Sequence, residues 1–378
     1  MNLPIPISTL AAFLIFLVLW EAFETIVFPR RVTRRIRLTR LFYRLTWNTW
    51  KRIVNLVPEN HHDNLLSIYG PISLLLLLTF WASMLVVNFG LIYWGLASLS
   101  EGGNSFAASL YFSGSTFFTL GLGDLKPLSS FARFITVAES GTGLGFLAIV
   151  IGYLPALNQS FSRREVNISL LDSRAGSPPT AAEMLRRHND DHGMESIRQL
   201  LHEWERWSAE LLESHLSYPV LAYFRSQHDN QSWLAALTSI LDASAFVMVG
   251  LEGACARQAQ LTFAMARHAI VDLCLIFRLR PISLNPDRLP PTTLANLRSG
   301  LAVSGLRPHT GKEADLKLIE LRSMYEPYLF ALSEHFGLKL PPWMPDPEAT
   351  DNWQTSEWVH DAKKAKRIAP HAGARRHF

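Results

Sequence analysis

The feature that most constrains this chain is the length of its apolar segments. Residues 65–100 carry no charged side chain, residues 3–20 carry none, and the only charge between residues 134 and 162 is Glu139. A helix needs about 20 mostly apolar residues to cross a bilayer, whereas uncharged helices of soluble cores are seldom longer than about 14. The pattern therefore predicts an all-α membrane protein with three transmembrane helices per subunit.

Basic residues orient these helices. The segment from residue 30 to residue 52 has no acidic residue and nine basic ones: Arg30, Arg31, Arg34, Arg35, Arg37, Arg40, Arg44, Lys51 and Arg52. Short loops rich in Lys and Arg stay on the cytoplasmic side of a membrane. We therefore expect the N-terminus outside and everything after residue 160 in the cytoplasm, with the protein in a bacterial inner membrane. The first segment lacks a basic start and a small-residue cleavage site, which indicates a retained helix.

The same basic segment also carries aromatic residues, among them Tyr43, Trp47 and Trp50. This mixture is typical of a helix lying on the inner leaflet, where its charges attract anionic lipid headgroups. An ordinary positive-inside loop without lipid specificity is the other interpretation. Beside a membrane helix, we expect no nucleic-acid partner.

A short apolar segment lies between the second and third membrane helices. It runs from Asn104 to Phe118, begins with the good N-cap residues Asn104 and Ser105, and is too short to cross a bilayer. Irregular backbone survives at membrane depth only where protein buries it or where it lines water. The sequence therefore predicts a re-entrant helix followed by a lining segment over residues 119–124.

Residues 116–124, "TFFTLGLGD", resemble the pore signature of potassium channels, T-x-x-T-V-G-Y-G-D. The resemblance covers residues 65–160. It implies a homotetramer around one filter, because a single loop cannot surround an ion. It also implies that K⁺ binds backbone carbonyls, plus the threonine hydroxyl, in place of its hydration shell. The residues that it assigns to the filter are Thr119, Leu120, Gly121, Leu122 and Gly123.

Two positions depart from the usual potassium-channel pattern. Leu122 replaces the usual tyrosine, and the matching position on the re-entrant helix, Phe112, has no hydrogen-bond donor, so an apolar pair is expected where many channels have a polar one. Tyr111 keeps a hydroxyl that can reach Asp124 behind the filter. We expect potassium selectivity, and a softer filter that admits some sodium is the alternative.

The third membrane helix carries the gating candidates. Gly143 follows Gly123 by 20 residues, which matches the hinge glycine of the resembled channels, although small residues also serve close helix packing. Pro155 removes a backbone donor and can kink the helix, so we place a gate between Ile151 and Pro155; a simple helix end is the alternative. Glu139 is either a gating group or a structural carboxyl with satisfied hydrogen bonds.

The second half of the chain has helical patterns, which predict a cytoplasmic α-helical domain whose ligand or partner the sequence does not identify. It shows no nucleotide-binding glycine motif and no phosphate loop. We expect no enzyme activity, no cofactor and no metal other than permeant K⁺. A membrane receptor with a non-conducting pore-like loop is the rival interpretation. The predicted segments are a first helix over 1–29, a basic linker over 30–64, a pore module over 65–160, a cytoplasmic domain over 161–345 and a disordered tail over 346–378.

Overall fold

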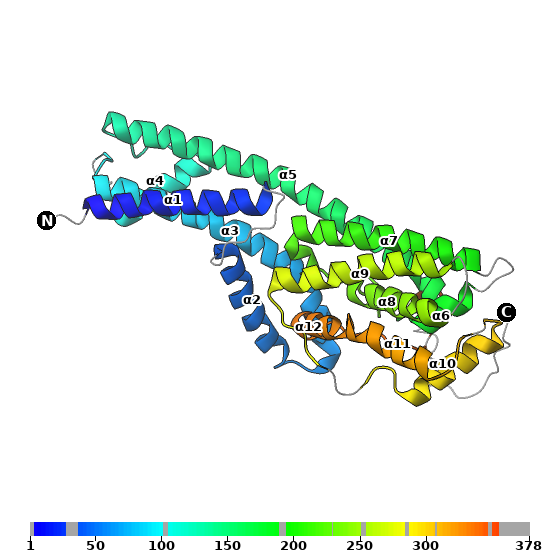
Figure 1. Cartoon of the computed structure of the whole chain (residues 1–378). Helices are drawn as coiled ribbons and strands as arrows, with labels where there is room; N and C mark the ends of the chain where they lie inside the picture. The colour runs from blue at the N-terminus through cyan, green and yellow to red at the C-terminus, as the bar shows by residue number, and fades with distance from the viewer. Residues whose placement is uncertain are drawn as a thin grey trace, which may run out of the picture. The chain divides into compact units, whose positions relative to one another are not determined.

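The computed structural model describes residues 4–27, 37–100, 105–188, 194–228, 230–250, 255–283, 287–306, 308–346 and 350–354. Within these ranges the regular structure is helical, apart from one isolated antiparallel bridge between Leu99 and Pro127 (Figure 1). The all-α prediction is therefore confirmed. Some predictions fall outside the described residues. They are those for Arg30, Arg31, Arg34 and Arg35, for Asn104, and for nearly all of the 346–378 tail.

The chain forms two compact units. The first, here called the membrane unit, comprises residues 1–161 together with the short segment His215–Phe224. The second, here called the cytoplasmic unit after the location that the sequence predicts for it, comprises residues 162–214 and 225–378. The sequence placed residues 215–224 with the cytoplasmic domain, whereas they pack with the membrane unit.

The membrane unit is organised around a long helix, α3. The helices α1 and α4 both pack against α3, and the residues that fill the interface between α1 and α3 are apolar, such as Val18, Leu77 and Trp81 (Figure 1). The helices of this unit are α1 (Pro4–Ile26), α2 (Leu38–Val54), α3 (His62–Leu96), α4 (Phe106–Phe117) and the first part of α5 (Ser130–Ala175).

The short helix α4 begins where the sequence predicts. The side chain of Ser105 caps it by accepting a hydrogen bond from the backbone N–H of Ala108 at 3.1 Å. Such a cap satisfies one of the backbone donors that a helix leaves unpaired at its start. The helix ends at Phe117, immediately before the predicted lining segment.

The amphipathic helix α2 is anchored to the end of α1 by a buried polar contact. The Arg37 guanidinium lies 3.3 Å from the Glu21 carboxylate, and the backbone N–H of Thr39 donates to the same carboxylate at 3.1 Å. Pairing is what makes a buried carboxylate tolerable in an apolar surrounding. Glu21, near the C-terminal end of α1, therefore fixes where α2 begins.

The helix α5 is longer than the sequence suggests. The predicted pore module ends at residue 160, but the helix continues without a break to Ala175 and contains Pro155. The charged residues that begin at Arg163 mark the end of the apolar surface. They do not end the helix, because Arg, Glu and Leu are good helix formers.

The cytoplasmic unit is a bundle of helices around α8, a nearly all-apolar helix that contacts α6, α9, α11 and α12. Its charged residue Asp242 is buried and pairs with Arg288 at 2.7 Å. Residues 312–336 hold two helices and not one, because Pro327, which cannot donate to the preceding turn, starts a new helix. The elements are α6 (Ala181–Arg187), α7 (Met194–Ser217), α8 (Trp233–Gly250), α9 (Cys255–Phe277), α10 (Pro291–Val303), α11 (Lys312–Ser323) and α12 (Glu326–Phe336).

Among the described residues, five helices are long and apolar enough to cross a membrane: α1, α3, α5, α8 and α9. They differ in how much of their surface other parts of the protein cover. Protein buries 89% of the most apolar stretch of α8, but only 22% of that of α1 and 11% of that of α5. A helix that protein surrounds on all sides satisfies its apolar surface without lipid, which argues against α8 as a crossing helix, whereas α3 and α9 are both 44% buried and are not separated in this way.

Candidate ion-conduction site

The loop after α4 has an alternating backbone. Thr119, Gly121 and Gly123 have positive φ angles of 60°, 59° and 76°, and they are separated by Leu120 and Leu122, which do not. Glycine adopts this left-handed region at little cost, whereas a threonine there is uncommon and marks a held conformation. The two glycines of the motif thus occupy the positions where the backbone requires them.

Hydrogen bonds from the end of α4 hold the start of this loop. The backbone N–H of Leu120 donates to the carbonyl of Ser115 at 2.8 Å, and that of Thr119 donates to Thr116 at 3.0 Å. On the other side, the N–H of Ser100 donates to the carbonyl of Lys126 at 3.0 Å, next to the bridge between Leu99 and Pro127. The loop is thus tied at both ends to the helices that frame it.

The apolar residues of the loop are exposed in the single chain. Leu120 and Leu122 are 64% and 63% exposed, and several large apolar residues of α5 are exposed as well, among them Phe134, Val137 and Ile151. A soluble monomer rarely leaves so large an apolar surface uncovered. This surface requires lipid or further protein to cover it.

Glu139 of α5 lies behind the loop and is fully buried. The Tyr93 hydroxyl of α3 donates to its carboxylate at 2.8 Å, and the Ser113 hydroxyl of α4 forms a short hydrogen bond to the other oxygen. The Ser113 hydroxyl also lies 2.8 Å from the carbonyl of Val86. This carboxyl therefore joins α3, α4 and α5 through side chains. The sequence does not identify Tyr93 and Ser113 as its partners, because hydroxyls elsewhere in the span have the same chemistry.

Gly143 lies where α5 meets the end of α4. A Cβ atom at this position would come within 2.0 Å of the Phe117 carbonyl oxygen, so only glycine fits. Its neighbours Gly141 and Gly145 face open space. Of the other gating candidates, Ile151 and Pro155 are exposed on α5, while Tyr153 between them is buried. The structure thus gives Gly143 a packing role, and the hinge remains a prediction.

The two aromatic residues expected to support the filter lie in different surroundings. Phe112 is buried, and its ring meets Tyr93 of α3 edge to face with the centroids 4.9 Å apart. It thus belongs to the core between α3 and α4, and Leu122 is exposed, so the expected apolar pair of these two residues is not formed within one chain. The Tyr111 hydroxyl is exposed and forms a hydrogen bond with the Asp124 carboxylate.

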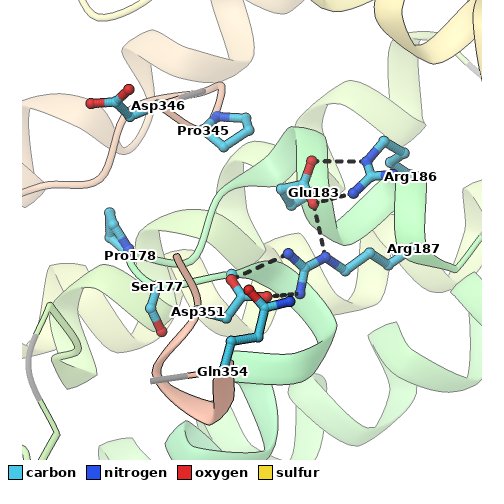
Figure 2. A pocket seen from close by; sticks show the side chains of 10 residues that line it. Ser177, Pro178, Glu183, Arg186, Arg187, Pro345, Asp346, Asp351 and Gln354 are labelled. Carbon is cyan, nitrogen blue, oxygen red and sulfur yellow. Dashed lines mark hydrogen bonds and ion pairs between the residues drawn. The ribbon is translucent and has the colours of Figure 1, made fainter. Parts of the chain in front are cut away.

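The cytoplasmic unit contains a polar cavity of about 300 Å³, lined in part by Arg186, Arg187, Glu183 and Asp351 (Figure 2). Both arginines donate to Glu183, at 2.6 Å and 2.8 Å, and Arg187 also lies 2.9 Å from Asp351. Because these cations are already paired with carboxylates, the cavity indicates no particular class of ligand. Within the described residues, no group of three or more His, Cys, Asp or Glu side chains is arranged to hold a metal ion.

The helices and loop around this site define a channel-type pore module. Residues 73–159, which hold most of α3, all of α4, the loop and the first part of α5, match a family model described as an ion channel, of the two-transmembrane-helix type found in potassium-channel pores. The resemblance noted in the sequence is thereby confirmed for this part of the chain.

A second comparison extends beyond the pore module. The chain is 26% identical over 223 residues to a protein of Bacillus subtilis (strain 168) named "Uncharacterized membrane protein YdjJ". The aligned part covers 57% of this chain and 62% of that relative. No solved structure matches the chain. Together with the apolar helices, these findings identify an integral membrane protein with an ion-channel domain.

Proposed function

We propose that four copies of this chain form a cation channel selective for K⁺, with the loop from Thr119 to Gly123 as the filter. The observation that carries this proposal is the alternating backbone at Thr119, Gly121 and Gly123, because such alternation lets successive carbonyls face one side. The exposed apolar surface of the loop and α5 supports the tetramer, since neighbouring copies would cover it. Passive conduction requires no catalytic group and no cofactor besides the permeant ion.

The proposed orientation follows the basic residues. The N-terminus lies outside, α1, α3 and α5 cross the bacterial inner membrane, and the bundle around α8 lies in the cytoplasm. The helix α2 lies on the inner leaflet with an outward face of Leu41, Leu45 and Ile53 beside the exposed Arg44 and Arg52. Apolar residues flanked by arginines suit a surface of anionic lipid.

The test is the reversal potential of the purified protein in planar bilayers with K⁺ on one side and Na⁺ on the other. A potential near the K⁺ equilibrium value that disappears in Thr119→Ala supports the proposal. A potential near zero with current that is still sensitive to this substitution supports a weakly selective cation channel, which the leucine at residue 122 favours. A mass in detergent that corresponds to one or two chains rules out the tetrameric filter.

The lipid part of the proposal has its own test. We expect K⁺ flux in liposomes that contain phosphatidylglycerol to exceed flux in liposomes of phosphatidylcholine alone. Replacing Arg44 and Arg52 together by Gln should remove the difference. Equal flux in both lipids would mean that α2 is an ordinary cytoplasmic loop helix.

A further inference from the structure

The segment His215–Phe224 leaves the cytoplasmic unit and packs within the membrane unit. It links α7 to α8, and at its centre is a short 3-10 turn over Pro219–Tyr223. Val220 and Leu221 of this turn are buried in the same apolar core as α1 and α3. The segment is therefore part of the packing of the membrane unit, although its first residues belong to the end of α7 and the chain after Phe224 returns to the cytoplasmic unit.

An aromatic cluster holds the segment against α2 and α3. The ring of Tyr223 stacks on Tyr43 with centroids 5.5 Å apart, meets Trp47 at 5.1 Å and lies 5.3 Å from Tyr69. The Tyr69 hydroxyl is also within 2.9 Å of the Thr46 hydroxyl of α2. Large rigid rings that meet in this way fix a segment at little cost in side-chain entropy.

A glycine in α3 makes room for the segment. A Cβ atom at Gly70 would lie 2.7 Å from the ring of Phe224 and 3.1 Å from the carbonyl oxygen of Tyr223. The neighbouring Pro71 lies inside the same helix. The segment thus packs directly on the backbone of α3, and a single methyl group at residue 70 would displace it.

The segment also contacts α5, which is the inner helix of the proposed channel. The contacts lie close to the gating candidates Ile151 and Pro155. Tyr218 meets Tyr153 of α5 with the ring centroids 5.5 Å apart, and Phe224 meets Phe161 of the same helix at 5.6 Å. Tyr153 is buried and precedes Pro155 by two residues. The segment therefore touches α5 on both sides of its proline.

The chain passes directly from this segment into the cytoplasmic unit. Phe224 packs on α5, and the next residue, Arg225, donates from its guanidinium to the carbonyls of Phe336 and Gly337 at 3.1 Å and 2.8 Å. Ser226 then donates to Glu165 at 3.3 Å. Arg225, which binds the end of α12, therefore follows directly in the chain after Phe224, which packs on α5.

From this geometry we propose that His215–Phe224 is the mechanical link by which the cytoplasmic unit controls the inner helix. A change of conformation in the cytoplasmic bundle moves Tyr218 and the aromatic cluster around Tyr223. Their movement shifts α5 at Tyr153, beside Pro155. This inference rests on the proposed channel function, since it assigns the origin of the gating movement. For this control to work, the segment must have two alternative packed arrangements, as other switching elements do.

The test compares the full-length protein in lipid nanodiscs with Gly70→Ala, using hydrogen exchange and K⁺ flux in parallel. In the variant we expect exchange over residues 215–224 and 150–158 to rise at least tenfold, while residues 115–124 keep their protection. K⁺ flux should change at least threefold at an unchanged reversal potential. The control is Gly300→Ala in α10, which also adds one methyl group but meets open space. Tyr218→Ala removes the contact with Tyr153 without adding atoms and should give the same result if Gly70→Ala does not fold.

Faster exchange at 215–224 with unchanged exchange at 150–158 would overturn the proposal, because the link would then not hold the inner helix. Unchanged flux in a variant whose exchange has changed at both places would also overturn it. If the wild-type protein carries no filter-dependent current while both exchange changes occur, the proposed channel function fails and the mechanical link stands.

Discussion

Gly143 of the inner helix lies directly against the backbone carbonyl of Phe117, at the point where α4 ends and the filter loop begins. A Cβ atom at residue 143 would be 2.0 Å from that oxygen. The obstacle is backbone and not a movable side chain, so the two helices would have to separate to make room. The close approach of α5 to the end of α4 is therefore possible only because residue 143 has no Cβ atom.

Replacing Gly143 by Ala is expected to destabilise the pore module by about 3 kcal/mol, at the upper end of the usual cost of overpacking. Thermal unfolding of the purified protein in detergent measures the effect. The matched control is Gly141→Ala, two residues earlier on the same helix, where nothing lies within 4 Å. Because alanine favours helix over glycine by about 1 kcal/mol, this control should be neutral or slightly stabilising. Equal melting temperatures for the two variants would contradict the contact.

The hydrogen bonds of Glu139 lead to a second prediction. Glu139→Ala removes the hydrogen bonds of the buried Tyr93 and Ser113 hydroxyls to the carboxyl. Ser113 keeps the Val86 carbonyl at 2.8 Å and Tyr93 keeps the Thr136 hydroxyl at 3.3 Å, so we expect a loss of roughly 1–3 kcal/mol in total. Glu139→Gln keeps the shape and one acceptor oxygen, so its loss should be less than half as large. Thermal unfolding of both variants decides the matter, with Tyr93→Phe as a single-bond reference. A Gln variant as unstable as the Ala variant would contradict the prediction, because the retained acceptor oxygen would then contribute no stability.

Sequence reasoning succeeds where one physical requirement leaves few choices. A bilayer demands long apolar helices, and the helices α1, α3 and α5 lie where that demand places them, although α8 and α9 meet the same length and composition. A left-handed backbone favours glycine, so Gly121 and Gly123 are recognisable from their spacing. The N-cap at Ser105 is equally local. Each of these features depends on residues that are neighbours in the chain.

The features that the sequence did not predict depend on partners that are distant in the chain. The charged residues from Arg163 onward show where the apolar surface of α5 ends. The helix itself continues past Arg163 because nothing in its local sequence breaks it. Tyr223 meets Tyr43 across 180 residues, and no periodicity records such a pairing. Phe112 packs on Tyr93 of α3, and this contact between two helices is likewise not recorded in the local sequence.

The filter backbone gives a third prediction. Gly121→Ala meets no steric obstacle, since nothing lies within 4 Å, but its φ of 59° costs an L-residue about 1–2 kcal/mol in each subunit. We expect K⁺ flux into liposomes to fall at least tenfold while the protein keeps its elution volume in gel filtration. Gly145→Ala adds the same methyl group in open space on α5 and should keep flux within twofold. Equal flux in both variants would show that the loop is not the conducting path.

The fourth prediction concerns acid sensitivity of the cytoplasmic unit. Burial alone would raise the pKa of Glu183, but its hydrogen bonds to Arg186 and Arg187 outweigh burial and hold the pKa below the usual 4.5 (Figure 2). A carboxylate with a lowered pKa in the folded state stabilises the fold above its unfolded pKa, and this contribution disappears as pH falls through the folded value. We therefore expect the melting temperature to drop steeply below about pH 4.5, and to drop less steeply in Glu183→Gln.

Glu195→Gln is the matched control for that measurement. Glu195 also pairs with an arginine three residues along its helix, Arg198, and that hydrogen bond lowers its pKa, but the pair is exposed. Water and salt screen exposed ion pairs, so they add little to stability. The acid slope of Glu195→Gln should therefore match that of the unmodified protein, and the difference between the two variants should persist in 0.5 M salt. If both variants flatten the slope equally, burial of the Glu183 cluster contributes nothing, and the acid response belongs to the net charge of the whole unit.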